Sequence, residues 1–443
     1  MESTTNRACG VHSARLNLVE YAVNFSDSHA PLTRSQALIE AERCYYCHDA
    51  PCATACPTSI DIPSFIQRIA QGNDRGAAKA ILEANPLGGM CARVCPTEVL
   101  CEQACVRNKN EDKPVEIGQL QRFATDALFD NPGAPLFTRA APTGKRIAVV
   151  GAGPAGLSFA VTAAQRGHAV VLFDGGSEIG GQLNIAKQVP GKEEFYETLR
   201  YYRRQLELHG VDVRLNTRVQ AGDLAGQGYD EVVVATGIKP RTPDIEGIDH
   251  PKVLSYLDVL RDKRPVGRRV AVIGAGGIGF DVGEYLTHEG ESGALAPAKF
   301  NDEWGIDTAY AQAGGLRAAQ VEAPTRQVHL LQRKTSKVGD QLGKTTGWIH
   351  RTSLKARNVG MSSGVAYERV DDAGLHITID GGASQVLDVD HIVVCAGQEP
   401  LRELVDPLQA AGRNPHLIGG ADVAAELDAK RAIDQGSRLA ATF

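Results

Sequence analysis

The stretch Arg146-Ile-Ala-Val-Val-Gly-Ala-Gly-Pro-Ala-Gly156 decides the fold of this chain. Four apolar residues after Arg146 predict a short buried strand. Gly151, Gly153 and Gly156 come next, at the spacing of a turn whose bare backbone lets a dinucleotide pyrophosphate approach closely. A glycine pattern alone is weak, so the prediction depends also on the residues beyond Gly156.

A helix is predicted directly after the glycines, from Leu157 to Arg166, and its N-terminus would face the pyrophosphate. The next strand, 169–173, ends on Asp174, which stands 23 residues after Gly151. A carboxylate there binds ribose hydroxyls. The alternative is that Asp174 is only a solvated residue at an exposed strand end. Strand, glycines, helix and acid together predict a dinucleotide site.

A second turn of the same kind comes after the apolar strand 269–273 and contains Gly274, Gly276 and Gly279. Its closing strand is delayed and is predicted at 327–331. No acid stands directly after that strand; Arg333 and Lys334 do. Basic residues at this place accommodate the 2′-phosphate of NADPH, so the sequence favours NADPH over NADH. The alternative is a strand end with incidental charges.

Eight of the ten cysteines form two runs, Cys44-x2-Cys47-x4-Cys52-x3-Cys56-Pro and Cys91-x3-Cys95-Pro-x4-Cys101-x3-Cys105. Thiolates bind iron–sulfur clusters, and a Cys-Pro that ends a run occurs in two-cluster ferredoxins. Structural zinc and disulfides are the alternatives, but neither explains two runs that each hold a Cys-Pro. Spacing alone nominates all eight as ligands, Cys91 included. Cys9 and Cys395 lie outside the runs and are expected to bind nothing.

Composition limits the class of protein. The chain has 443 residues, enough for two or three domains, and 47 glycines, which suit α/β nucleotide-binding folds. The net charge of −6 and the lack of a basic run argue against nucleic acid. No apolar stretch approaches the ~20 residues that span a bilayer, and Met1 to Arg15 lack the apolar core of a secretory signal. The expected location is the cytoplasm.

The two glycine turns lie about 120 residues apart, so they predict two separate βαβ units and not a single Rossmann domain. The predicted fold is α/β: a helical two-cluster domain and then two Rossmann-like domains of three-layer ββα type, one inserted in the other. Expected boundaries are 1–140 for the cluster domain, 141–265 with 386–443 for the FAD domain, and 266–385 for the NAD(P)H domain. A linker is expected from Asn131 to Gly144, and 288–325 is an insertion of unknown role.

Residues 32–126 resemble the cluster domain of dihydropyrimidine dehydrogenase and of the glutamate synthase small subunit. Shared motifs include Cys44-x2-Cys47-His-Asp-Ala-Pro-Cys52, Cys91-Ala-Arg-Val-Cys95-Pro-Thr and Ile117-Gly-x-Leu-Gln-Arg122. The resemblance implies two [4Fe–4S] clusters. It assigns Cys44, Cys47, Cys52 and Cys105 to one, and Cys56, Cys95, Cys101 and Gln121 to the other.

From Lys145 onward the chain resembles the flavin half of bacterial 2,4-dienoyl-CoA reductase. The match includes Ser177-Glu-Ile-Gly-Gly-Gln-Leu-Asn-Ile-Ala-Lys187, Gly343-Lys-Thr-Thr-Gly-Trp-Ile-His350 and Leu417-Ile-Gly-Gly-Ala-Asp422. This resemblance implies that NADPH binds at the second turn, with Arg333 at its phosphate and Trp348 near the cofactors. It also implies that FAD is held by the first turn together with Ala155, Asp174, Gly181, Gln182, Lys192, Val219 and Asp422.

These features predict an oxidoreductase that passes electrons from NADPH through FAD to the clusters. No side chain is nominated as catalytic, because the cofactors supply the hydride chemistry. Both resembled families reduce their substrates at FMN in a TIM barrel of ~250 residues, for which this chain has no room. A catalytic partner subunit, such as an FMN barrel, is therefore expected. The alternative is a self-contained NADPH flavoenzyme that reduces a small acceptor such as an enoyl-CoA, a quinone or a dye.

Overall fold

A computed structural model describes residues 16–25, 30–130, 133, 135–425 and 428–443. Cys9 and part of the expected linker lie outside these residues. The chain divides into two compact units: Met1–Ala30 with Gly290–Ala323, and Pro31–Glu289 with Pro324–Phe443. Within the described residues, every helix is too short or too polar to cross a bilayer.

The smaller unit joins two stretches that lie far apart in the sequence. Asn17 caps helix α1 (Leu18–Asn24) by accepting from two backbone amides, and the aromatic ring of Tyr21 stacks on that of Tyr310 with 5.4 Å between centroids. The expected insertion contributes α15 (Pro297–Trp304) and the 3₁₀ turn η2 (Ala313–Gly315) to this unit. The insertion is thus packed with the N-terminal helix, a contact that the sequence pattern does not reveal.

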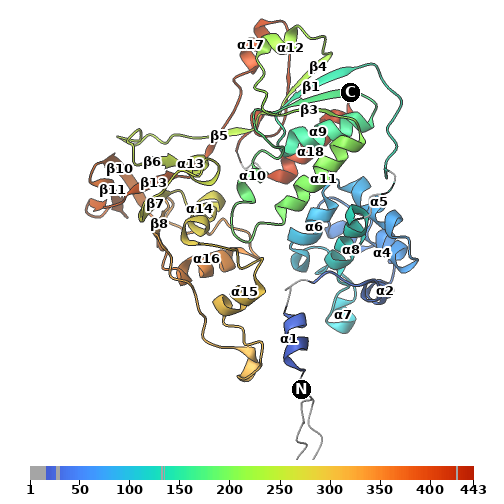
Figure 1. Cartoon of the computed structure of the whole chain (residues 1–443), viewed down its shortest axis with the longest axis horizontal. Coiled ribbons are helices and arrows are strands. Elements are labelled where there is room, and N and C mark those ends of the chain that lie inside the picture. Colours follow the sequence, from blue (N-terminus) through green and yellow to red (C-terminus); the bar gives the residue numbers. More distant parts are fainter. Residues whose placement is uncertain (1–15, 26–29, 131–132, 134, 426–427) are drawn as a thin grey trace, which may run out of the picture. The chain divides into compact units, whose positions relative to one another are not determined.

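The cysteine-rich region is a bundle of short helices (Figure 1). Two of them have proline in the first turn. Pro51 is the first residue of α3, and Pro63 is the second residue of α4, whose N-cap is Asp61. The apolar faces of α4, α5 and α8 form the core, in which Phe65 and Leu120 are fully buried. The helical elements of this region are α2 (Arg34–Glu42), α3 (Pro51–Ala55), α4 (Ile62–Ala70), α5 (Asp74–Ala84), α6 (Gly88–Val94), η1 (Thr97–Val99), α7 (Asn108–Glu111) and α8 (Ile117–Asp130).

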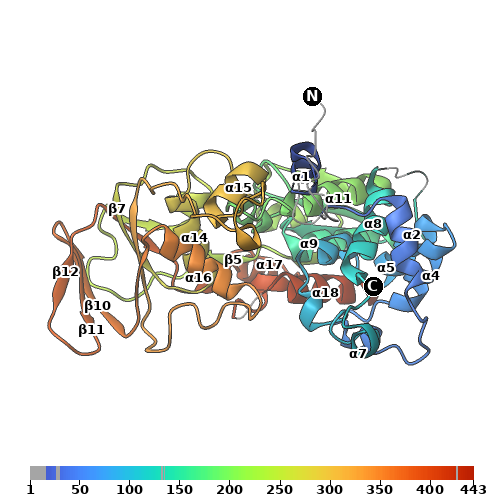
Figure 2. The same cartoon turned by 90° about the horizontal axis from the view of Figure 1, so that it is seen from below.

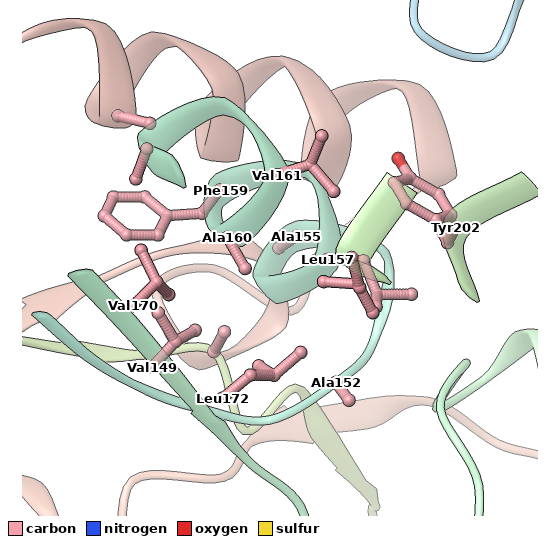
Figure 3. Packing of buried hydrophobic residues seen from close by; sticks show 14 of the residues in the cluster. Val149, Ala152, Ala155, Leu157, Phe159, Ala160, Val161, Val170, Leu172 and Tyr202 are labelled. Carbon is pink, nitrogen blue, oxygen red and sulfur yellow. The ribbon is translucent and has the colours of Figure 1, made fainter. Parts of the chain in front are cut away.

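The first parallel sheet has the order β15-β4-β1-β2-β3 and is built around β1, the strand that leads into the first glycine turn. Its strands are β1 (Arg146–Val150), β2 (Ala169–Phe173), β3 (Asp212–Arg214), β4 (Glu231–Val234) and β15 (His416–Leu417). Helices α9 (Pro154–Gln165) and α18 (Ala429–Ala441) lie side by side over it. Figure 3 shows Leu157 and Phe159 of α9 in one cluster with Val149, Val170 and Leu172 of the sheet. This domain also contains α10 (Leu183–Ala186), α11 (Phe195–Leu208), α12 (Ala221–Ala225), α17 (Val405–Ala410) and η3 (Gly419–Ala421).

The second parallel sheet has the order β6-β13-β7-β8-β9, with α14 and α16 near its central strands. A meander of three antiparallel strands, β10 to β12, stands beyond it at one end of the domain (Figure 2). The elements are β6 (Val253–Ser255), α13 (Tyr256–Leu260), β7 (Arg269–Ile273), α14 (Gly277–Thr287), β8 (Gln327–Leu331), α16 (Gly347–Ala356), β9 (Gly360–Ser362), β10 (Val365–Asp371), β11 (Gly374–Ile379), β12 (Gln385–Leu387) and β13 (His391–Val394).

Two antiparallel strands, β5 (Ile238–Pro240) and β14 (Gln398–Pro400), form the ribbon through which the chain passes between the two sheets. The predicted α/β class with a helical cluster domain and two Rossmann-like domains is confirmed. The domain boundaries stay a prediction. Because β6 and β13 pair in the second sheet, we propose that the NAD(P)H domain extends beyond 266–385, as far as the ribbon on both sides.

Candidate cofactor sites and thiol groups

Two of the three glycines in the first turn, Gly151 and Gly156, leave no room for a side chain. Gly151 has a φ of +111°, and a Cβ on it would lie 2.3 Å from the carbonyl oxygen of Ala235. A Cβ on Gly156, in the first turn of α9, would lie 1.9 Å from the carbonyl oxygen of Gly151. Gly153 caps α9, and the helix N-terminus therefore opens directly onto the turn. This is the bare backbone that a pyrophosphate requires.

Asp174 comes directly after β2 and organises this turn. One of its carboxylate oxygens accepts from the amide of Ala152 at 2.6 Å, and the other accepts from the amide of Gly176 at 2.7 Å. The backbone of Gly181 packs directly against the turn, since a Cβ on Gly181 would lie 2.9 Å from the Cα of Gly153. Gln182 comes next in the chain. The turn, the acid and the loop 175–182 thus stand together as the sequence predicts for a dinucleotide site.

A buried hydroxyl without a partner lies near Gln182. Tyr256, at the start of α13, is almost fully buried, and its hydroxyl lies near the amides of Gln182 and Gln398 although neither meets hydrogen-bond geometry. Burial raises the pKa of this phenol. An orphaned buried hydroxyl is costly unless a ligand satisfies it. Two amides and a phenol that converge beside the first turn fit the polar edge of a flavin ring.

The remaining predicted flavin residues are held by side-chain contacts or packing. Gln435 donates to Asp422 at 2.7 Å and so fixes this carboxylate ahead of α18. Val219 is buried beside Phe173 in the core under the sheet. Ala155 is buried in the first turn of α9. These placements are compatible with FAD binding, and the individual contacts stay a prediction.

A row of charges joins the two nucleotide-binding domains. Lys192, from the loop before α11, pairs with Asp281 of α14 at 2.6 Å between Nζ and Oδ1. One turn further along α14, Glu284 pairs with His350 of α16 at 2.7 Å. This hydrogen bond with Glu284 raises the pKa of His350 above its ordinary value. Lys192 therefore bridges the domains in addition to its predicted place at the flavin.

The second glycine turn repeats the first. Gly274 has a φ of +103°, and a Cβ on it would lie 2.7 Å from the carbonyl oxygen of Cys395. A Cβ on Gly279 would lie 1.9 Å from the carbonyl oxygen of Gly274. Gly276 caps α14, and a Cβ on it would meet nothing within 4 Å. The space over this helix N-terminus is open to a pyrophosphate.

The closing strand β8 stands where it was predicted and leads into an exposed basic loop. Arg333 and Lys334 are exposed directly after this strand. Between Gln332 and Val338 the chain has three cations and no acid. Trp348 lies at the start of α16 and is 55% exposed, so it fills no core position.

One group of four thiols lines a hollow between the loop 44–52 and the segment 105–107. Its members are Cys44, Cys47, Cys52 and Cys105. Burial, together with the neighbouring thiols of Cys44 and Cys105, raises the pKa of Cys52 to about 11. The structure therefore brings together the four cysteines that the resemblance assigns to one cluster.

The second group contains Cys56, Cys91, Cys95 and Cys101. Burial raises the pKa of Cys95 to about 11 and that of Cys101 to about 12, with further contributions from neighbouring thiols of this group. Cys91 lies near Cys56 and accepts from the amide of Asn85 at 3.1 Å.

Gln121, on α8, is only 7% exposed and donates through Nε2 to the carbonyl of Gly88 at 2.6 Å, which leaves its amide oxygen for another partner. Of the two candidates for the fourth ligand, Cys91 lies on α6 and Gln121 contacts Gly88, the first residue of that helix.

The donor chemistry of both groups fits iron–sulfur clusters. The nine described cysteines are all free thiols. Each group gathers four sulfurs, and metal binding would displace the protons of their thiols. In the part of the chain that the structure describes, no three His, Cys, Asp or Glu side chains form the compact group that holds a single metal ion.

Two glycine turns on two parallel sheets, with an unsatisfied buried phenol beside the first turn and two thiol groups, define a pyridine-nucleotide-dependent redox protein joined to an iron–sulfur domain. Residues 145–420 match the family described as pyridine nucleotide-disulphide oxidoreductase, and the chain belongs to this family. Residues 21–132 match the domain described as dihydropyrimidine dehydrogenase domain II, 4Fe-4S cluster. The predicted class of oxidoreductase, with iron–sulfur, flavin and nicotinamide cofactors, is confirmed.

Named relatives agree with both parts. The chain is 34% identical over 273 residues to the NAD-dependent dihydropyrimidine dehydrogenase subunit PreT of Escherichia coli K12, a match that covers 59% of this chain and 65% of that one. It is 31% identical over 280 residues to the glutamate synthase [NADPH] small chain of the same organism, over 58% of each. The match thus spans less than two thirds of either relative.

Solved structures show the same fold at low identity. A 2-naphthoyl-CoA reductase complex has a TM-score of 0.58 at 23% identity, over 85% of this chain and 52% of that one. The 6-hydroxypseudooxynicotine amine oxidase of Pseudomonas geniculata N1 has a TM-score of 0.57 at 22% identity, over 87% and 52%. These likenesses support the arrangement of domains and no particular substrate.

Several site residues were not predicted from the sequence. Tyr256 and Gln398 come from segments without a motif, and Asp281, Glu284 and His350 meet only after folding. Asp281 and Glu284 lie on the helix that the second glycine turn opens, which was the one available signal.

Proposed function

We propose that this chain is the electron-input subunit of a multi-subunit reductase. It takes electrons from NADPH, passes them to its clusters and delivers them to a partner. When bound, FAD accepts two electrons as hydride and releases them singly, which one-electron clusters require. The observation that carries the proposal is the presence of two bare glycine turns and two groups of four thiols in one chain.

The chain's own residues have distinct tasks in this scheme. FAD would be held by Gly151, Gly153, Ala155, Gly156, Asp174, Gly181, Gln182, Lys192, Val219 and Asp422. The nicotinamide cofactor would be held by Gly274, Gly276, Gly279, Arg333, Lys334 and Trp348. One [4Fe–4S] cluster would be held by Cys44, Cys47, Cys52 and Cys105. The other would be held by Cys56, Cys95, Cys101 and Gln121, with Cys91 as the alternative fourth ligand.

The preference for NADPH rests on the loop after β8. Arg333 and Lys334 are exposed there without an acid between Gln332 and Val338 that could bind a 2′-hydroxyl. The relatives differ on this point, since PreT is named NAD-dependent and the glutamate synthase chain carries NADPH in its name. The basic loop favours NADPH as the cofactor of this chain.

A partner subunit is expected because the named relatives are themselves a subunit and a small chain. We propose that the partner reduces the final substrate, with an FMN TIM barrel as the candidate. Nucleic acid and membranes are not expected partners. A cytoplasmic location suits eight grouped thiols, which need a reducing compartment.

An anaerobic titration tests the proposal. NADPH added to protein loaded with both cofactors should bleach the flavin band and then produce the electron paramagnetic resonance (EPR) signal of reduced clusters. Iron and sulfide should be present in equal amounts, near eight of each per chain. Bleaching of the flavin without any cluster signal would instead support the self-contained flavoenzyme. Zinc in place of iron and sulfide would reject electron transfer through the thiol groups.

A further inference from the structure

One arginine stands in the sequence between two cysteines of the second thiol group and reaches the flavin-binding half with its side chain. Arg93 is on α6, between Cys91 and Cys95, and its side chain is only 6% exposed. The next residue, Val94, is 54% exposed. Because a guanidinium has five N–H donors and is costly to bury, this nearly buried side chain needs hydrogen-bond or charged partners.

Three elements provide those partners. The Nη2 atom of Arg93 donates to both carboxylate oxygens of Asp126 on α8, at 2.7 and 2.9 Å, and Nη1 donates to the carbonyl of Gly89 at 3.0 Å. The Nε atom lies 2.7 Å from Oε2 of Glu194, which precedes α11. This last contact is an ion pair and not an aligned hydrogen bond. One side chain therefore joins the cluster domain to the FAD domain.

The segment that carries Glu194 also carries Lys192. The amide of Phe195 donates to the carbonyl of Lys192, so these residues form one tight turn at the start of α11. Lys192 pairs with Asp281 at its flavin side, and Glu194 pairs with Arg93 at its cluster side. A shift of either ion pair would move the other, because only one residue separates them.

Other contacts support the same interface. The rings of Phe129 on α8 and Tyr201 on α11 lie 5.5 Å apart, and Arg200 pairs with Asp130 at 3.5 Å. Arg93 differs from these residues because it stands on α6 between Cys91 and Cys95, and so connects the helix that leads into Cys95 to the FAD domain.

We propose that Arg93 is a positioning residue for electron transfer, an inference that rests on the proposed function. Through Asp126 and Glu194 it holds the second thiol group at a fixed place against the flavin-binding half. The guanidinium is paired with two carboxylates, so its role in this inference is one of position.

Three variants of the loaded protein test this role. In Glu194→Gln, the rate at which clusters are reduced after the flavin should fall by about fivefold, the effect expected for one partly exposed ion pair, with iron content kept. In Arg93→Gln, which loses the contacts with both Asp126 and Glu194, the rate should fall at least as far. In Arg93→Lys, which keeps the charge and loses the planar guanidinium, the rate should also fall. The midpoint potentials of both clusters should stay unchanged in all three variants, so that a lower rate reports position. Lys79→Gln is the matched control, since Lys79 pairs with Glu83 at 3.6 Å within α5 and should not change the rate.

The measurements are an EPR-monitored redox titration and stopped-flow reduction. Equal rates of cluster reduction in wild type and Arg93→Gln, at equal iron content, would overturn the inference. If Arg93→Gln fails to hold iron, the same comparison with Arg93→Lys and Glu194→Gln decides, and unchanged rates in both overturn it. Clusters that NADPH never reduces in the wild type would instead reject the proposed function itself.

Discussion

Removal of the two cations after β8 should change the cofactor preference of this protein. Arg333 and Lys334 are exposed, so neither is needed to fill the core, and their replacement by alanine should leave the fold intact. Only NADPH carries the 2′-phosphate that they would bind. The double variant should therefore lose efficiency with NADPH and keep it with NADH.

The size of the loss depends on the kind of contact. Charge-assisted hydrogen bonds contribute about 1.5–3 kcal/mol, so Arg333→Ala should lower kcat/KM for NADPH by about 10- to 100-fold. Lysine acts as an exposed point charge worth about 0.2–1 kcal/mol, so Lys334→Ala should cost about fivefold at most. High salt should weaken the NADPH preference of the wild type for the same reason.

The assay is steady-state reduction of a dye acceptor with each cofactor. Lys355→Ala is the matched control, because Lys355 is an exposed cation in the last turn of α16 and lies outside the loop. It should change neither efficiency. An unchanged ratio of NADPH to NADH efficiency in the double variant would refute the phosphate assignment.

Three further changes test the other sites. Gly156→Ala should abolish FAD binding, because its Cβ would lie 1.9 Å from a backbone oxygen of the turn; flavin content after purification measures this, and normal content would contradict the predicted turn. If Gln121 is a ligand, Gln121→Leu should lose or alter one cluster while Cys91→Ala keeps both, as counted by iron content and EPR; the reverse result would make Cys91 the ligand. The raised pKa of His350 means that its ion pair with Glu284 is complete below the ordinary value of 6.5 and is lost as pH rises through the raised value. Glu284→Gln should therefore lower the pKa of His350 in an NMR titration, and its deficit in Tm should shrink as pH rises.

Short-range sequence patterns predicted the main parallel strands and the two glycine turns of this molecule. The strands 146–150, 169–173, 269–273 and 327–331 all form at the predicted residues, because an apolar run that ends in glycines or charges has few other interpretations. Both glycine turns were predicted for the same reason. A bare turn is a property of a few consecutive residues, and sequence shows it directly.

Contacts between distant residues could not be predicted in this way. The ring of Tyr310 meets that of Tyr21 across nearly 300 residues of sequence, and nothing in the periodicity of either segment indicates the other. Arg93 belongs to a recognisable motif, but its role was not predicted, since its partners Asp126 and Glu194 come from two separate elements. Side chains of this kind gain their roles from tertiary structure alone.

The two cysteine runs are interleaved in space, and this arrangement couples cluster binding to folding. The first thiol group takes Cys105 from the second run, and the second group takes Cys56 from the first run. On the proposed ligand sets, each cluster would therefore link two distant segments of the helical domain. Metal binding of this kind contributes directly to folding free energy. Loss of Cys56 or Cys105 should then unfold more of the domain than loss of Cys47, because only the former pair joins the two runs.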